Sequence, residues 1–203
     1  MMQNKVRVIG ITGITGSGTS TVAGLLKEKG GLVISADCLA HDAIKKGQEA
    51  YIKIVEKFGK SILLTDGEIN RKALGAVVFG EENQENRAWL ESIVHPAVLS
   101  IIREQIRGCE GQFVVIDAPL LIESGLDKEC DEVWLVTADD EARASRIIKR
   151  DGVDKATAEK RLKSRQNERN LARHADVVIE NNGDYMSLRG RVENLRKNHP
   201  LVT

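Results

Sequence analysis

The residues best suited to chemistry lie in the stretch GITGSGTST, which runs from residue 13 to residue 21. Its glycines let the chain curl tightly without Cβ clashes. Backbone N–H groups in such a turn, and at the start of a following helix, can converge on a polyphosphate. The P-loop pattern G-x-x-x-x-G-K-[ST] fits Gly13, Gly18 and Ser20, but Thr19 stands where the pattern has lysine. The residues predicted to bind a nucleotide's phosphates are Gly13, Gly16, Ser17, Gly18, Thr19, Ser20 and Thr21.

Glycines also mark plain turns, so the flanks of this stretch decide between the two interpretations. The apolar run 6–12 precedes it and predicts a buried strand, and residues 22–27 follow with a helical pattern. A glycine-rich turn between a strand and a helix is the context that a P-loop requires. The flanks therefore favour phosphate binding over a plain turn.

Two residues are candidates for holding Mg²⁺. Ser20 occupies the position of the P-loop hydroxyl that contacts the metal, although a serine there also suits a helix N-cap, and one residue can do both. Asp117 closes the apolar run 112–117 and resembles a Walker B carboxylate. Its alternative is a cap or turn at the end of the strand. The predicted metal site is Ser20 with Asp117.

Asp37 is the candidate for acid–base chemistry. It follows the short apolar run 32–35 and precedes Cys38. One interpretation is a helix N-cap, a common role of aspartate. The other is a catalytic base that accepts the proton of an attacking hydroxyl in phosphoryl transfer. The position alone leaves both open.

A basic segment offers cations for a polyanion. Between Arg143 and Arg173 the chain has 11 Lys/Arg and 4 Asp/Glu. A solvated helix face is one interpretation, and a clamp on phosphates beside the P-loop is the other. Arg146 and Arg150 lie one helical turn apart, and planar guanidinium groups suit the oxygens of a transferring phosphoryl group. A mobile arginine-bearing lid would also exclude water.

These residues need elements that bring them together, and the apolar pattern predicts an α/β fold. The predicted strands are short apolar runs at 6–12, 32–35, 112–117, 132–136 and 177–180. Helical patterns separate them, at 22–27, 43–58, 140–150, 155–165 and 185–198, with a break at Gly47 in the second. A further helix is predicted from the N-cap Asn70 to residue 79. Another runs over 85–94 and stops before Pro96, and a separate helix follows Pro96 to about residue 107. Alternating strands and helices predict an open parallel sheet of about five strands with helices on both faces.

In such sheets ligands bind at the carboxyl ends of the strands, where the glycine-rich turn, Asp37 and Asp117 all fall. We therefore expect these three features to converge. The predicted organisation is a nucleotide-binding core of residues 1–37, 110–145 and 174–203, a helical insertion of residues 38–109, and a basic lid of residues 146–173.

Composition sets wider limits. A chain of 203 residues with 41% hydrophobic and 30% charged residues is ordinary for one globular core with a modest insertion. Thirty basic residues balance thirty acidic ones, so no overall charge draws the protein to nucleic acid or membrane. Three cysteines without metal-ligand spacing, and no signal peptide or membrane span, predict a cytoplasmic protein.

Several motifs across almost the whole chain resemble one family. In order, they are GITGSGTSTVA, SADCLAH, FGKSILLTDGEINRKAL, LESIVHP, VVIDAPLLIESGL, RIIKRDGV and ADVVIENNG. Each alone is weak, but their order and spacing resemble dephospho-coenzyme A kinase, which carries out the last step of coenzyme A synthesis.

The resemblance implies transfer of the γ-phosphoryl group of ATP to the ribose 3′-hydroxyl of dephospho-coenzyme A, with Mg²⁺. Asp37 matches the family's catalytic aspartate, and Arg146 matches a lid arginine that approaches the phosphates. Arg143 and Arg150 are the further lid residues expected to contact the nucleotide. Asn181 lies where the last strand leads into the pocket for the nucleotide base.

The resemblance also implies an acceptor site. The helical insertion matches the acceptor-binding domain, with Arg71 and His95 at family motif positions, and Leu120 and Glu123 lie in the PLLIESGL motif. The expected partner is the small molecule dephospho-coenzyme A, and no nucleic acid or membrane partner is expected. The expected state is a monomer or a weak homo-oligomer.

The chain departs from the family pattern at several positions. Thr19 replaces the P-loop lysine, Ser35 replaces an acid, His41 an arginine and Arg143 a glutamine. Three explanations are open for the lost lysine: a lid arginine such as Arg143 supplies the charge, the enzyme is slow, or the chain binds nucleotide without catalysis. A kinase of another nucleoside-like acceptor is a further alternative.

Overall fold

The computed structural model describes residues 6–110, 112–163 and 168–198. The chain divides into two compact units, one formed by the residues up to Ser35 together with those from Ile106 onward, and the other by Ala36–Gln105.

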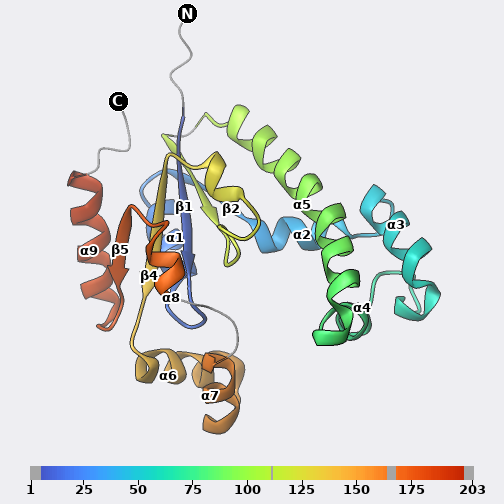
Figure 1. The fold of residues 1–203 in the computed structure, drawn as a ribbon. Helices are drawn as coiled ribbons and strands as arrows, with labels where there is room; N and C mark the ends of the chain where they lie inside the picture. Colours follow the sequence, from blue (N-terminus) through green and yellow to red (C-terminus); the bar gives the residue numbers. More distant parts are fainter. Residues whose placement is uncertain (1–5, 111, 164–167, 199–203) are drawn as a thin grey trace, which may run out of the picture. The chain divides into compact units, whose positions relative to one another are not determined.

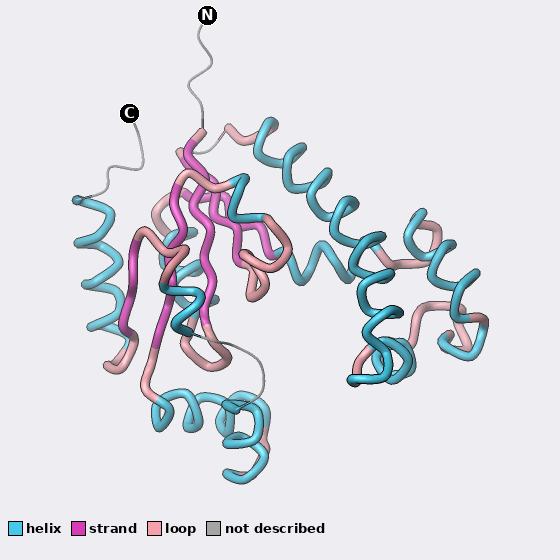
Figure 2. The backbone as a smooth tube through the Cα atoms, in the orientation of Figure 1, coloured by secondary structure: helices cyan, strands magenta, loops and turns pink. Residues whose placement is uncertain are grey.

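The first unit contains a five-stranded parallel sheet (Figure 1; magenta in Figure 2). Its strands lie in the order β2-β3-β1-β4-β5, with every neighbouring pair parallel. Their bounds are β1 (Arg7–Gly13), β2 (Gly31–Ser35), β3 (Phe113–Asp117), β4 (Glu132–Thr137) and β5 (Val177–Glu180). The predicted α/β fold and its five strands are confirmed. Short apolar runs were a sufficient signal for β1, β3 and β4, because these strands are buried along almost their whole length and lack polar alternation. The edge strands β2 and β5 include exposed residues.

Helices cover the sheet on both faces. On one face, α1 (Thr19–Lys27) and α9 (Tyr185–Asn198) share a buried core with alternate strand residues, which include Ile11 and Trp134. On the other face, Leu135 packs with Ile14 and with Leu171 of α8 (Glu168–Ala172). The short helix α8 was not predicted.

The segment that follows β3 lies tightly against β1. It includes η3 (Leu126–Glu129), and a Cβ on Gly10 would come within 2.7 Å of both Cys130 Sγ and Leu121 Cδ2. A side chain at position 10 would therefore displace this segment. Burial, together with the carboxylates of Asp127 and Asp131, raises the pKa of the Cys130 thiol to about 12.

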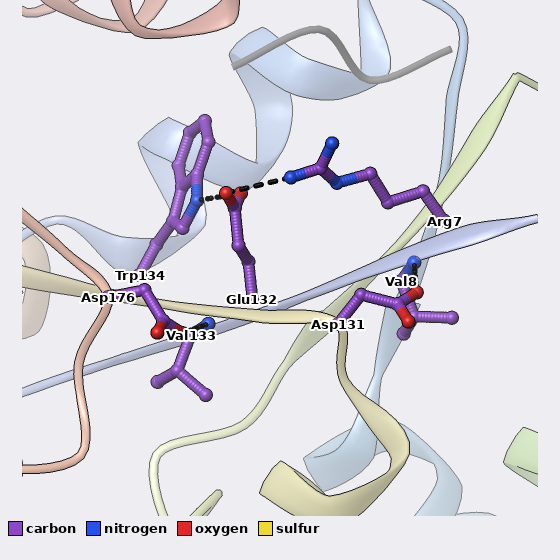
Figure 3. Close-up of polar contacts among 7 residues, drawn as sticks. All are labelled: Arg7, Val8, Asp131, Glu132, Val133, Trp134 and Asp176. Carbon is purple, nitrogen blue, oxygen red and sulfur yellow. Dashed lines mark hydrogen bonds and ion pairs between the residues drawn. The ribbon is translucent and has the colours of Figure 1, made fainter. Parts of the chain in front are cut away.

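Three acidic residues lie where the strands begin, at the side of the sheet that we call its starting edge. We call these residues, Asp131, Glu132 and Asp176, the strand-start clasp (Figure 3). Asp131 Oδ2 accepts the N–H of Val8 at 2.9 Å, and Asp176 Oδ2 accepts the N–H of Val133 at 2.8 Å. Glu132 accepts from Arg7 Nη2 at 2.8 Å and from Trp134 Nε1 at 3.0 Å. The clasp therefore ties the start of β4 and the residue before β5 to neighbouring strands.

After β4 the chain forms a helical hairpin of α6 (Asp140–Asp151) and α7 (Lys155–Lys163). Gly152 ends α6 in the left-handed conformation, with φ of 64°. The predicted end of the second helix, Arg165, lies outside the described residues.

The second unit is helical. It consists of α2 (Ala36–Ala43), α3 (Glu49–Phe58), η1 (Lys60–Ile62), α4 (Arg71–Val78), η2 (Glu81–Asn83) and most of α5 (Gln84–Arg107). Buried Ile54, Leu74 and Val78 belong to its core. The predicted N-cap Asn70 is confirmed, because its side chain accepts the N–H groups of Lys72 and Ala73.

Two helix predictions in this unit were wrong. The predicted stop before Pro96 is absent, and α5 runs through this proline for 24 residues. Proline removes one intrahelical hydrogen bond, which costs about 3 kcal/mol, and burial of Val98 and Ile102 in the following turns offsets this cost. The predicted break at Gly47, which has φ of 93°, is confirmed. The helical pattern predicted to start at residue 43 is wrong at its start, since Ala43 ends α2 and α3 begins at Glu49.

Among the described helices, none combines the length and the apolar character needed to cross a lipid bilayer.

Candidate nucleotide-binding site

The loop that joins β1 to α1 depends sterically on its glycines. Gly16 and Gly18 have φ of 83° and 101°, a region that residues with a Cβ rarely adopt. A Cβ on Gly18 would lie 2.4 Å from Asn181 Nδ2, and one on Gly13 would lie 2.5 Å from the carbonyl oxygen of Val136. Side chains at these positions would break the loop or displace its neighbours.

The inner side of the loop presents backbone donors. Within the described part of the chain, the N–H groups of Gly16, Gly18, Thr19 and Ser20 have no hydrogen-bond partner. The N–H groups of the next two residues of α1 both bond to the carbonyl of Gly18. Unbonded donors in a tight loop at a helix N-terminus form a site for an anion such as a phosphate.

The carbonyl groups of the same loop are held by Arg143, Arg146 and Asn181, which we call the carbonyl clamp. Arg143 Nε donates to the carbonyl of Thr15 at 2.9 Å. Arg146 Nη1 lies 3.3 Å from the carbonyl oxygens of residues 16 and 17, and Asn181 Nδ2 donates to the latter at 2.7 Å. Because C=O and N–H point in opposite directions in a trans peptide, holding the carbonyls turns the N–H groups of Gly16 and Gly18 the other way.

The clamp residues are themselves anchored. Arg143 is 6% exposed, and its Nη1 also bonds to Asp140 at 2.7 Å. Arg146 Nη2 donates to the backbone carbonyl of Asn181 at 2.7 Å. Asn181 is 5% exposed. The structure thus gathers these three predicted site residues around the loop, in contact with its backbone.

The predicted metal residues lie together at the carboxyl ends of the strands. Ser20 Oγ donates to Asp117 Oδ2 at 3.3 Å. Within the described residues, no cluster of three or more His, Cys, Asp or Glu side chains could enclose a metal. A hydroxyl and a carboxylate beside a phosphate site fit Mg²⁺, which is usually held by one or two protein oxygens plus substrate phosphates.

Other predicted residues of this unit lie apart from the loop's contacts. Arg150 bonds to Asp151, which also bonds to Arg161, and the hydrogen bond from Arg150 lowers the pKa of the Asp151 carboxyl. Thr21 is the exception, because it is an exposed residue of α1 whose N–H bonds to the carbonyl of Gly18. Leu120 and Glu123 are exposed in the segment after β3.

Three predicted residues belong to the second unit. Asp37 is exposed in the first turn of α2, and His95 is half-buried in α5 directly before Pro96. Arg71 begins α4, and its Nη1 lies 3.1 Å from both ring nitrogens of His41. The contact between Arg71 and His41 was not predicted, because the two residues are 30 positions apart and follow no shared periodicity.

One supporting contact was also missed. Asn182 Oδ1 accepts the N–H of Asp139, directly before α6, at 2.8 Å. An asparagine pair after a strand was the available signal, but its partner is 43 positions away.

Comparison with known proteins agrees with this geometry. The sequence profile of the dephospho-CoA kinase family matches residues 7–187. The chain belongs to the dephospho-CoA kinase family. It is 41% identical to a dephospho-CoA kinase of Symbiobacterium thermophilum over 191 residues, covering 93% of this chain and 79% of the relative. It is 39% identical to that of Geobacter sulfurreducens over 193 residues, covering 94% and 97%.

A solved structure supports the same assignment. The dephospho-CoA kinase from Campylobacter jejuni superposes with a TM-score of 0.69 at 27% identity, covering 95% of this chain and 96% of that one. The sequence-based resemblance is therefore confirmed, and Thr19 belongs to a chain that is otherwise similar to dephospho-CoA kinases over most of its length.

Proposed function

We propose that this dephospho-CoA kinase family member transfers the γ-phosphoryl group of ATP to the ribose 3′-hydroxyl of dephospho-CoA. The observation that carries the proposal is the set of unbonded N–H groups at Gly16, Gly18, Thr19 and Ser20, beside the Ser20–Asp117 pair. This combination suits a metal-bound polyphosphate, and it lies within the span that the family profile matches.

The loop would bind the phosphates of ATP through its backbone. Its donors are fixed by the fold before the ligand arrives, so little reorganisation accompanies binding. Ser20 and Asp117 would hold Mg²⁺, which when bound neutralises phosphate charge. Arg150 would contact the phosphates from the lid of residues 146–173, and Arg146, at the start of that lid, would support the loop through the carbonyls of residues 16 and 17. Asn181 would border the base pocket while it supports the loop through Ser17.

Phosphoryl transfer needs a base, and we assign this role to Asp37. The 3′-oxygen forms a bond to the γ-phosphorus, and the bond from that phosphorus to the β–γ bridging oxygen breaks. ADP leaves, and the proton of the hydroxyl passes to the carboxylate of Asp37. The helical insertion would bind the acceptor through Arg71 and His95, with Leu120 and Glu123 contributing from the core.

No disulfide joins the three cysteines, all of which lie in the described part of the chain, and this suits a reducing compartment such as the cytoplasm. The expected state is a monomer or a weak homo-oligomer.

The deciding experiment measures ADP formation from Mg·ATP with and without dephospho-CoA. Wild type is expected to show acceptor-dependent turnover, and Asp37→Asn is expected to lower kcat by about 10²-fold or more. Asp42→Asn removes an exposed carboxylate from the same helix and should leave kcat unchanged. Binding of Mg·ATP by calorimetry without any turnover would instead support a nucleotide-binding homologue without catalysis.

A further inference from the structure

The loop lacks the cation that its own pattern calls for. In a P-loop, a lysine at the position of Thr19 reaches the β- and γ-phosphates. Here the Thr19 methyl faces β1, since a Cβ on Gly13 would lie 2.9 Å from Thr19 Cγ2. Threonine brings no charge, so the positive charge for a bound polyphosphate has to come from elsewhere.

Arg143 is a buried cation in this unit. Among the residues whose burial is described, it is the one Lys or Arg that is almost fully buried, at 6% exposure. Its Nε bonds directly to the loop carbonyl of Thr15. Its partner Asp140 offsets part of the charge, but the side chain of Asp140 is 82% exposed against 8% for Arg143. Water therefore screens the carboxylate far more than the guanidinium.

The first turns of α6 are docked on the loop. A Cβ on Gly16 would lie 3.0 Å from the carbonyl oxygen of Arg143 and 3.2 Å from its Cα, so the two backbones are in direct contact. Asn182 holds the N–H of Asp139, and Arg146 holds the carbonyl of Asn181. The guanidinium of Arg143 is thus placed by the core of the unit.

We propose that Arg143 is a positioning residue that supplies, from the carbonyl side of the loop, the positive charge that position 19 lacks. It acts through the peptide between Thr15 and Gly16. With the carbonyl drawn to the guanidinium, the Gly16 N–H points at the phosphate side, and the buried charge increases the affinity of that donor for an anion. The inference rests on the proposed nucleotide site and assigns Arg143 no contact with the phosphates.

A double-mutant cycle with Thr19→Lys and Arg143→Gln tests this inference. The readout is the Kd for the Mg²⁺ complex of a non-hydrolysable ATP analogue, measured by calorimetry on folded proteins checked by thermal melting. Glutamine can still donate to the Thr15 carbonyl but carries no charge. Arg143→Gln is expected to weaken binding about tenfold in wild type. In the Thr19→Lys background the loss should fall to about threefold or less, because a lysine restores the charge.

An equal loss in both backgrounds would overturn the proposal, because a purely structural role of Arg143 cannot be rescued by a lysine at position 19. No loss in wild type would overturn it as well. Lys27→Gln removes the same charge from an exposed position at the end of α1 and is expected to leave Kd unchanged.

A charge-retaining variant keeps the proposal testable if Arg143→Gln does not fold. Arg143→Lys is expected to stay within about threefold of wild type. A folded Arg143→Lys that binds tenfold more weakly would overturn the role of charge. If the enzyme turns over with the acceptor but the effects of the two substitutions on Kd are additive, this inference alone is overturned. If the two effects on Kd are coupled but there is no turnover, the kinase proposal alone is overturned. Absence of binding in all variants and in wild type would sink both.

Discussion

The strands of the parallel sheet begin together at one side, the starting edge, and end together at the other, the carboxyl edge. These two edges use backbone polar groups in opposite ways. At the starting edge, the clasp carboxylates of Asp131 and Asp176 accept the N–H groups of Val8 and Val133. At the carboxyl edge, the loop leaves the N–H groups of Gly16 and Gly18 without protein partners among the described residues. Satisfied polar groups stabilise a fold, whereas oriented and unsatisfied ones bind ligands. One edge therefore holds the sheet together, and the other has the unbonded donors at which we propose that an anion binds.

The charges at the two edges follow the same division. Carboxylates approach the backbone at the starting edge, where they accept from N–H groups. Guanidinium groups approach it at the carboxyl edge, where Arg143 and Arg146 donate to carbonyls. Carboxylates at the starting edge thus bond to backbone N–H groups. Guanidinium groups at the carboxyl edge bond to backbone carbonyls and leave backbone N–H groups unbonded. If this comparison holds, substitutions at the two edges should separate ligand binding from stability.

The largest effect is expected from Gly18→Ala. The new Cβ would lie 2.4 Å from Asn181 Nδ2 in a backbone conformation that alanine rarely adopts. We expect Mg·ATP binding to weaken about 100-fold as the loop donors lose their orientation. Gly24→Ala is the matched control in α1, where a Cβ meets nothing within 4 Å. It should keep binding and raise the free energy of unfolding by about 0.5–1 kcal/mol. Intact binding in Gly18→Ala would contradict the steric account.

Asp117→Asn should impair the metal site while the fold persists. The amide keeps the shape of the carboxylate but loses the charge that suits Mg²⁺. We expect acceptor-dependent kcat at fixed Mg²⁺ to fall about tenfold or more, with partial recovery at high Mg²⁺. A Mg²⁺ titration of the rate checks this. An unchanged Mg²⁺ dependence would remove Asp117 from the site.

Glu132→Gln tests the opposite edge. The carboxylate of Glu132 is about 10% exposed and bonds to Arg7 and Trp134. Its neutralisation should lower the free energy of unfolding by about 2 kcal/mol, without changing the Kd for Mg·ATP. Denaturant unfolding and calorimetry on one preparation check both. Glu180→Gln breaks an exposed ion pair with Arg191 and should cost less than about 0.5 kcal/mol. Weaker nucleotide binding in Glu132→Gln would show that the edges are not independent.

The smallest expected effect is on the pH dependence of the free energy of unfolding. Burial raises the pKa of Cys130 to about 12, from an ordinary 9.0. The folded state therefore favours the neutral thiol, and this contribution is complete below pH 9 and declines as the pH rises from 9 to 12. Between pH 8 and pH 10 the free energy of unfolding of wild type should fall by about 1 kcal/mol more than that of Cys130→Ala. Parallel curves for the two proteins would contradict the raised pKa.

Much of the fold could be predicted because its signals are local. The strand runs are apolar over consecutive residues, and Asn70 caps a helix whose N–H groups lie two and three positions away. Pro96 misled because its local effect on a helix was outweighed by packing that the neighbouring residues do not reveal. The short helix α8 escaped prediction because its tertiary contact through Leu171 supports it more than its length does.

The parallel sheet, the glycine-rich loop and the absence of a lysine at position 19 could be predicted from the sequence, since each depends on residue types over a few consecutive positions. The sequence also identified the family. The side chains that surround the loop could not be predicted, because they come from distant parts of the chain. Arg143 meets Thr15 across 128 positions and Asn181 meets Ser17 across 164, and no periodicity links residues so far apart. Such contacts arise when the sheet brings the ends of separate strands together, and they decide which loop carbonyls are held and which N–H groups stay available for a ligand.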